Sequence, residues 1–121
     1  YYDSFQEQFP TGHLLQTQKD LLTWASINQK KSQIGPVLGV LSAGHMAFEI
    51  DRSDVQPSLM QMTKMAVQYL QGRSKQYLLI IEGARIDHAH HKGNAARALS
   101  ETAMLADSVQ LADEMTDDEE T

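Results

Sequence analysis

The sequence contains no cysteine, and this absence excludes two kinds of site. Neither a disulfide framework nor a zinc site built on thiolates can form within these 121 residues. No apolar run approaches the roughly 20 residues that span a bilayer, and the opening YYDSFQEQFP lacks the basic and then apolar order of a signal peptide. A cysteine-free chain fits a reducing compartment and a piece of a secreted protein equally well, so the sequence carries no address of its own.

Basic residues are also in the minority. Ten Lys and Arg stand against 16 Asp and Glu, which gives a formal net charge of -6. The basic residues are scattered and form no stripe, so we expect no nucleic-acid partner. Neither a GxSxG motif nor a P-loop occurs, which leaves nucleophile-elbow hydrolases and P-loop nucleotide hydrolases without support. The hydrophobic content of 41% nevertheless permits a core.

The first third of the chain predicts a loop followed by a helix. Residues 1–16 show no sustained periodicity and favour a loop. Thr17 and Asp20 have the spacing of a helix start, and the apolar residues that follow predict a helix to about Asn28. The polar stretch NQKKSQ after it predicts a second loop.

The middle of the chain predicts a strand, a loop and a helix. VLGVL, at residues 37–41, is typical of a short buried strand. The charged residues between His45 and Gln56 predict a surface loop whose charges face water. Pro57 at a first helical turn opens SLMQMTKMAVQYLQ, in which apolar residues recur at three- and four-residue spacing. We interpret the methionines of this helix as core residues rather than a promiscuous binding face.

The last part of the chain repeats the order of strand and helix. Gly72 is expected to end the preceding helix, and QYLLII is a continuous apolar run that predicts a strand buried on both faces. A helical pattern then runs from about Gly93 to about Met115, and TDDEET predicts a solvated acidic connection. Alternating strands and helices indicate an α/β fold with a mostly parallel sheet.

The candidate site lies where QYLLII ends at Glu82. In open α/β sheets function gathers beyond the carboxyl ends of the strands. The oxygen and nitrogen donors of Asp87 and His91 suit zinc, whereas a lone carboxylate such as Glu82 suits magnesium with several waters. Gly83 and Gly93 permit tight backbone paths around this segment. Spacing alone leaves two alternatives open, a metal centre and a polar turn with merely exposed histidines.

The neighbouring polar residues have less definite roles. Composition does not assign His88 or His90 as ligands, and we expect His90 to be solvated or to support a ligand. Arg85 could clamp a phosphate, although a lone arginine more often pairs with an acidic neighbour. His13 and His45 have no partners in the sequence and are expected at the surface.

Several stretches resemble the alkaline phosphatase family. EGARIDHAHHKGNAARALSETAM is similar to the family's metal-binding segment, which reads close to EGGRIDHGHH and leads into a helix with an ALxET-like stretch. PSLMQMTKMAVQYL resembles its PSLMEMTEAAL helix, VLGVLSAGHMAFEI its LLGLFEPGDMKYEI, and MTDDEET its LTSEEDT. The likeness is close over residues 35–121 and looser over residues 1–34. It implies part of a three-layer α/β/α sandwich with a mostly parallel sheet.

The resemblance also implies roles for individual residues. Glu82 matches the family's magnesium-binding glutamate. Asp87 and His91 match two ligands of the first zinc ion, whose third protein ligand is a histidine much later in the full chain. His88 matches a position near the substrate phosphate where the family has histidine or lysine. The implied cofactors are two zinc ions and magnesium in each full-length subunit.

The family's activity would need residues outside this window. In the family mechanism a serine attacks a phosphate monoester, a phosphoserine forms, and zinc-activated water hydrolyses it. The nucleophilic serine is expected upstream of residue 1, and an Asp-His pair for the second zinc beyond Thr121. We therefore expect residues 1–121 to be an internal piece of one catalytic domain. Alone, this piece should be inactive and either unstable or prone to aggregate, because exposed sheet edges and little buried area leave chain entropy uncompensated.

Several positions depart from the family pattern. Ala84 and Ala89 stand where the family commonly has glycine, and a methyl group costs about 1 kcal/mol or more where φ is positive. Their small size predicts tolerance. Leu41, Ser42 and Gln56 stand where some animal members have calcium-binding residues, two of them carboxylates, so no calcium site of that type is predicted.

Two alternatives to an active phosphatase remain. One is a non-catalytic relative, a binding or cell-surface receptor protein that kept the fold. A complete set of metal ligands in the rest of the full-length protein would argue against this alternative. The other is a metallohydrolase acting on phosphodiesters or sulfate esters, which the EGARIDHAHH context disfavours. The resemblance further implies an extracellular, cell-surface or periplasmic location, homodimers, and membrane attachment only through a lipid anchor of the full-length protein.

Overall fold

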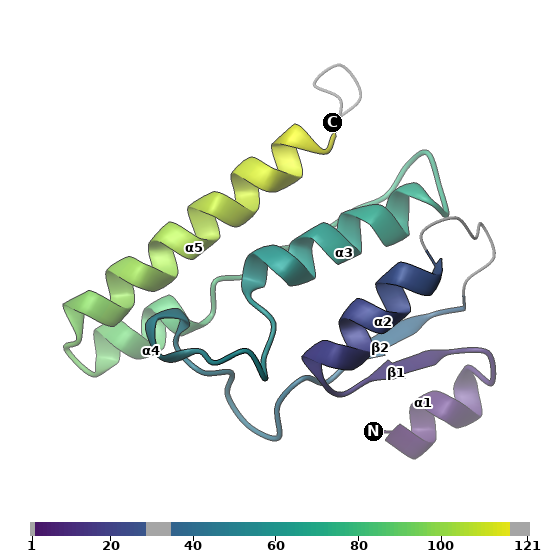
Figure 1. Cartoon of the computed structure of the whole chain (residues 1–121), viewed down its shortest axis with the longest axis horizontal. Helices are drawn as coiled ribbons and strands as arrows, with labels where there is room; N and C mark the ends of the chain where they lie inside the picture. Colours follow the sequence, from purple (N-terminus) through teal and green to yellow (C-terminus); the bar gives the residue numbers. More distant parts are fainter. Residues whose placement is uncertain (1, 29–34, 117–121) are drawn as a thin grey trace.

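The computed structural model describes residues 2–28 and 35–116, in which helices pack around a small parallel sheet (Figure 1). The elements in chain order are α1 (Tyr2–Gln8), β1 (His13–Leu15), α2 (Gln18–Asn28), β2 (Val37–Gly39), the 3-10 helix η1 (Glu49–Asp51), α3 (Leu59–Gln71), α4 (Arg85–His91) and α5 (Ala95–Glu114). The expected α/β fold class is confirmed. None of the helices within these residues is long and apolar enough to cross a membrane.

The sheet is formed by β1 and β2, which α2 connects. The two strands run parallel, with His13 opposite Val37 and Leu15 opposite Gly39. Leu15 and two residues of α2, Leu21 and Trp24, are buried together with Met65 of α3. The first core therefore joins the sheet to α2 and α3.

Helices α2 and α3 begin at reciprocal side-chain caps. The backbone N–H of Asp20 donates to Thr17 Oγ1 (3.0 Å), and Asp20 Oδ2 accepts from the Thr17 N–H (2.9 Å). Ser58 and Gln61 form the same arrangement before α3. The predicted start of α2 and its end at about Asn28 are confirmed. Pro57 lies before the Ser58 cap instead of inside the first turn of α3.

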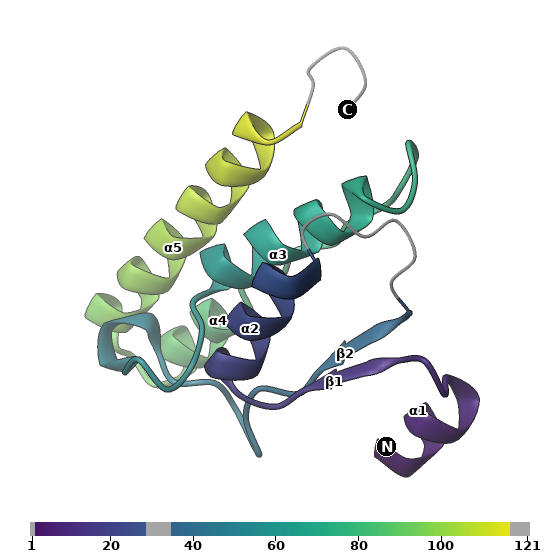
Figure 2. The same cartoon turned by 45° about the vertical axis from the view of Figure 1, so that its right-hand side comes forward.

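Helix α3 lies between α2 and α5 in both views (Figures 1 and 2). Its Met65 is buried in the first core and Met62 packs against that core, whereas Met60 is exposed. The predicted core role therefore holds for two of these three methionines. Gly72 caps the carboxyl end of α3 as predicted.

A second core forms where η1, α4 and α5 meet. Phe48, Ala89 and Ala98 are buried together, and Ala89 is 0% exposed. The predicted helix from about Gly93 to about Met115 is confirmed as α5, with Asn94 as its cap. This second core fixes the segment that carries the candidate site.

Two predictions about loops and charges were wrong, and a third was right only in part. Residues 2–16 were expected to form a loop, but they contain α1 and β1. Strand β1 forms by pairing with residues 37–39, a long-range contact that no local pattern reveals. The segment between His45 and Gln56 is largely irregular as predicted, but it contains η1. Its charges do not all face water, because Arg52 Nε donates to Glu49 Oε2 (2.8 Å) and the Glu49 N–H donates to Glu101.

The predicted strand QYLLII is extended but unpaired. Leu78 and Ile80 are 83% and 82% exposed, while Leu79 and Ile81, which alternate with them, are half-buried. Burial on both faces was therefore wrong for the described part of the chain, which offers this segment no neighbouring strand. The loop predicted for NQKKSQ and the acidic connection TDDEET fall mostly outside the described residues.

Candidate metal centre

The candidate site is carried by a short helix instead of the predicted turn. Helix α4 packs through Ala89 against Phe48 and Ala98, and its main neighbour is α5. It ends at Lys92, and Gly93 then adopts a φ of 61° that brings the chain into α5. The tight backbone path expected at Gly93 is thus confirmed.

Asp87 and His91 lie on one exposed face of α4. Their separation of four residues is about one helical turn, and Asp87 Oδ2 is 3.4 Å from His91 Nε2. The side chains of His91 and Asp87 are 78% and 74% exposed. One oxygen donor and one nitrogen donor are therefore adjacent and exposed to solvent in the described part of the chain.

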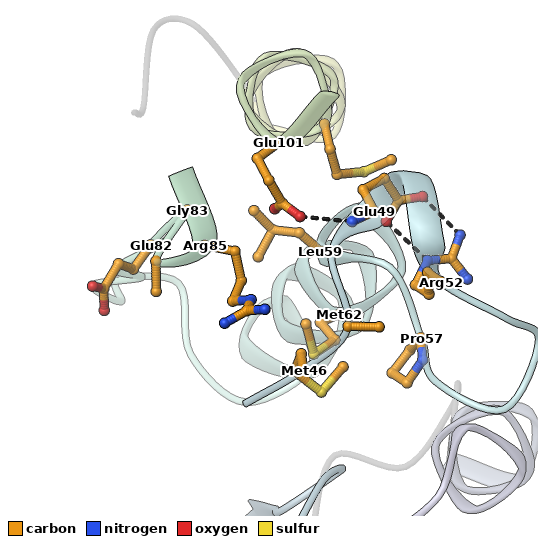
Figure 3. Close-up of a pocket in the computed structure, with 13 residues that line it drawn as sticks. Met46, Glu49, Arg52, Pro57, Leu59, Met62, Glu82, Gly83, Arg85 and Glu101 are labelled. Atoms are coloured by element: carbon orange, nitrogen blue, oxygen red, sulfur yellow. Dashed lines mark hydrogen bonds and ion pairs between the residues drawn. The ribbon is translucent and has the colours of Figure 1, made fainter. Parts of the chain in front are cut away.

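Glu82 does not join this pair. It is exposed at the end of the extended segment, and in Figure 3 its carboxylate points away from Arg85. Within residues 2–28 and 35–116, no three His, Asp or Glu side chains are close enough to hold one ion. The structure therefore brings together two of the three predicted ligands.

His88 lies on a different face of α4, where it contacts residues that were not predicted from the sequence as its partners. Arg85 Nη1 donates to His88 Nδ1 (3.0 Å), and the rings of His45 and His88 have centroids 4.4 Å apart. Arg85 was expected to pair with an acidic neighbour, but its guanidinium lies over Phe48, with Cζ 3.8 Å from the ring centroid. His45 is exposed as predicted, but it does have a partner.

Phe48 is the centre of a cationic cluster. Besides Arg85, Arg97 Cζ lies 4.8 Å and Lys92 Nζ 5.7 Å from the ring centroid. Phe48 is 5% exposed, and cations over a desolvated aromatic face are stabilised by its quadrupole. Arg97 also pairs with Asp51, at 2.7 Å between Nε and Oδ2. Sequence reasoning missed Phe48, whose only signal was its place in the stretch VLGVLSAGHMAFEI.

A small pocket lies beside this cluster, lined by Glu49, Arg52, Leu59, Met62, Glu101 and others (Figure 3). Its volume of about 120 Å³ is well below the roughly 300 Å³ of small ligand sites. The charges there are already paired, since Arg52 donates to Glu49 through both Nε and Nη2, and these hydrogen bonds raise the pKa of the Arg52 guanidinium. The pocket is therefore small for a substrate, and the charges of Arg52 and Glu49 in it are already paired.

The remaining predicted residues have ordinary surroundings. His90 is exposed, as expected, whereas His13 is half-buried and its ring makes an edge-type contact with that of Trp24. Ala84 has a φ of -57°, and within the described residues only Gly93 has a positive φ, so the alanine methyls cause no backbone strain. Gln56 Nε2 donates to Ser42 Oγ (3.3 Å), which joins two of the positions compared with calcium ligands.

Comparison with known proteins identifies the family. The family model for alkaline phosphatase matches residues 3–121. The human tissue-nonspecific alkaline phosphatase isozyme is 33% identical over 121 residues, which are 99% of this chain and 22% of the relative. The chicken tissue-nonspecific isozyme is 38% identical over 91 residues, and alkaline phosphatase 4 of Drosophila melanogaster 34% over 110 residues.

These matches cover most of this chain and a small part of each relative. The chicken and fly proteins are each matched over 18% of their length, against 74% and 89% of this chain. The family match extends through the first third, where the resemblance by motif was loose. The chain belongs to the alkaline phosphatase family.

Proposed function

We propose that these 121 residues are an internal part of an alkaline phosphatase that hydrolyses phosphate monoesters. In this proposal Asp87 and His91 bind zinc, Glu82 binds magnesium, and His88 lies beside the substrate phosphate. Family membership supports the phosphatase class. The serine that forms the phosphoserine and the ligands of a second zinc ion belong to parts of the protein outside this window.

The observation that carries the proposal is the spacing of Asp87 and His91. Zinc binds carboxylate oxygen and imidazole nitrogen at about 2.0 to 2.1 Å, so two donors at tetrahedral corners are about 3.3 Å apart. Asp87 Oδ2 and His91 Nε2 are 3.4 Å apart. An exposed ion pair would give a similar distance, but it would contribute little to stability. The donor types and their separation therefore fit zinc.

Glu82 fits a different kind of site. Magnesium keeps several waters and is often held by one or two carboxylates. Glu82 is exposed at the end of an extended segment, where other parts of a longer protein could supply further oxygen ligands. A role as one of several magnesium ligands is therefore compatible with its surroundings.

The residues of this chain would contribute positioning and charge. When bound, zinc supplies Lewis-acid stabilisation of charged phosphate oxygens and acidifies water. Asp87 and His91, fixed on one face of α4, would hold the ion, and His88 would offer a hydrogen bond to the phosphate. The packing of Ala89 in the second core keeps this helix in place on α5. By family resemblance we further propose that the full-length protein is exported and forms homodimers. Any attachment to a membrane would be through a lipid anchor.

The proposal is tested in the full-length gene product that contains these residues. We expect Asp87→Asn and His91→Gln to lower zinc content, measured by plasma mass spectrometry, and to lower kcat/KM for p-nitrophenyl phosphate by about 100-fold or more. Each substitution removes a charge or a donor from an exposed position, so folding should be preserved.

His90→Gln is the matched control, because His90 is an exposed histidine on the same helix that is not proposed as a ligand. It should retain zinc and activity. Equal losses in the His90 variant would contradict the assignment of ligands. A full-length protein that folds but hydrolyses no phosphate monoester would instead favour the non-catalytic, receptor-like alternative.

A further inference from the structure

The hydrogen bond between Arg85 and His88 fixes where the proton of the imidazole lies. The two residues are three positions apart on α4, and Arg85 Nη1 is 3.0 Å from His88 Nδ1. A guanidinium has only donors and stays charged in proteins. His88 Nδ1 must therefore accept, and the ring proton is on Nε2.

Arg85 is itself held in place by apolar and aromatic contact. Its guanidinium lies over Phe48, and its Nε is buried without a hydrogen-bond partner among the described residues. The other arginine over this ring, Arg97, has its charge paired with Asp51. Within the described residues no carboxylate competes for Arg85, so its donor remains directed at His88.

His45 restricts the imidazole from another side. The His45 and His88 rings are 4.4 Å apart between centroids and are inclined at 57°. The His88 ring, with Nδ1 bonded to Arg85 and one side in contact with His45, has lost much of its rotational freedom before any substrate binds. Such pre-organisation lowers the entropic cost of aligning a donor with a reacting group.

We propose that Arg85 is a positioning residue for His88, which it holds as an Nε2–H donor toward a phosphate oxygen of the substrate. The inference rests on the proposed phosphatase function. It also means that His88 is not a zinc ligand, because Nδ1 is bound to Arg85 and Nε2 carries the proton. The role of His88 is then distinct from that of the neighbouring Asp87.

A double-mutant cycle in the full-length gene product tests the positioning role. Arg85→Met removes every donor but keeps a long side chain over Phe48, and it should lower kcat/KM for p-nitrophenyl phosphate by about tenfold. His88→Ala should cost at least as much, and the double variant no more than His88→Ala alone, because Arg85 acts only through His88. Arg85→Lys, which keeps a cationic donor, should restore most of the activity.

Arg97→Met is the matched control, since Arg97 also lies over Phe48 but does not bond to His88. Its effect should simply add to that of His88→Ala. Additive losses for Arg85→Met and His88→Ala would overturn the positioning role and leave the phosphatase proposal intact.

A second readout does not depend on activity. In two-bond ¹H–¹⁵N spectra of histidine-labelled protein, assigned with His88→Ala, His88 should carry its proton on Nε2 alone. Arg85→Met should introduce the second tautomer, and Arg97→Met should not. A proton on Nδ1, or a spectrum unchanged by Arg85→Met, would overturn the inference even in a protein without phosphatase activity.

Discussion

Gly93 controls the path of the chain between the helix of the candidate site and α5. Its φ of 61° lies in the left-handed region, and a Cβ at this position would meet nothing within 4 Å. Backbone strain alone should therefore set the cost of a side chain. We expect Gly93→Ala to lower the free energy of unfolding of the full-length protein by about 1 kcal/mol, measured by urea denaturation.

Gly44→Ala is the control for this prediction. A Cβ at Gly44 also meets nothing within 4 Å, but Gly44 has no left-handed φ. Its substitution should leave stability unchanged or slightly raised, because alanine restricts the unfolded chain. If both variants lose the same stability, the conformation of Gly93 is not the cause.

At the scale of residues, the sequence predicted partners that are close along the chain better than those that are distant. The pair Asp87 and His91 could be anticipated as a donor set from its residue types, and its four-residue spacing becomes one turn of α4. Phe48 and His45 could not be placed beside Arg85 and His88, because some 40 positions separate these pairs. Their contact depends on the packing of residues 45–48 against α4, which no local pattern encodes.

The start of α2 shows how a helix terminus can make stability depend on pH. The Thr17 hydroxyl, followed by the backbone N–H of Gln16, lowers the pKa of Asp20 below its usual 3.8. A lowered pKa in the folded state stabilises the fold at pH values above 3.8, and this contribution is lost as the pH falls through the folded pKa. Acid should therefore weaken α2 at its first turn.

We expect Asp20→Asn to reduce the acid sensitivity of the fold. The wild-type protein should lose more stability between pH 7 and about pH 3 than the variant does, since the variant has no carboxylate to protonate. Urea midpoints at the two pH values measure the difference. Asp3→Asn is a suitable control, because Asp3 is exposed in α1. Equal pH dependence in wild type and Asp20→Asn would contradict the role of the cap.

Among the elements, the three long helices were predicted more reliably than the short helices and the strands. The limits of α2, α3 and α5 follow from caps and from apolar spacing within each helix. β1 is only three residues long and is defined by its pairing with β2, so its sequence contains no independent signal. QYLLII has the composition of a central strand, but a strand also needs a neighbour, and the described residues supply none.

For the whole molecule, this unpaired segment determines how the isolated chain should behave. Leu78 and Ile80 are exposed on one side of an extended backbone whose N–H and C=O groups have no partner strand in the described residues. Such a segment can pair with a copy of itself. The human tissue-nonspecific relative extends well beyond the matched region, which is 22% of its length. In a longer protein the same side would be available to other strands.

We therefore expect the isolated 121-residue chain to self-associate and to show no phosphatase activity. Leu78→Lys combined with Ile80→Lys should shift it toward monomer, because the charges repel copies along the exposed edge. Size-exclusion chromatography with light scattering measures the change. Leu99→Lys is the control, since Leu99 is also an exposed leucine but lies on α5. A monomeric wild-type chain, or an equal effect of Leu99→Lys, would contradict association through residues 77–81.

Robust hydrolysis of p-nitrophenyl phosphate by the isolated chain would show that its own residues suffice for catalysis.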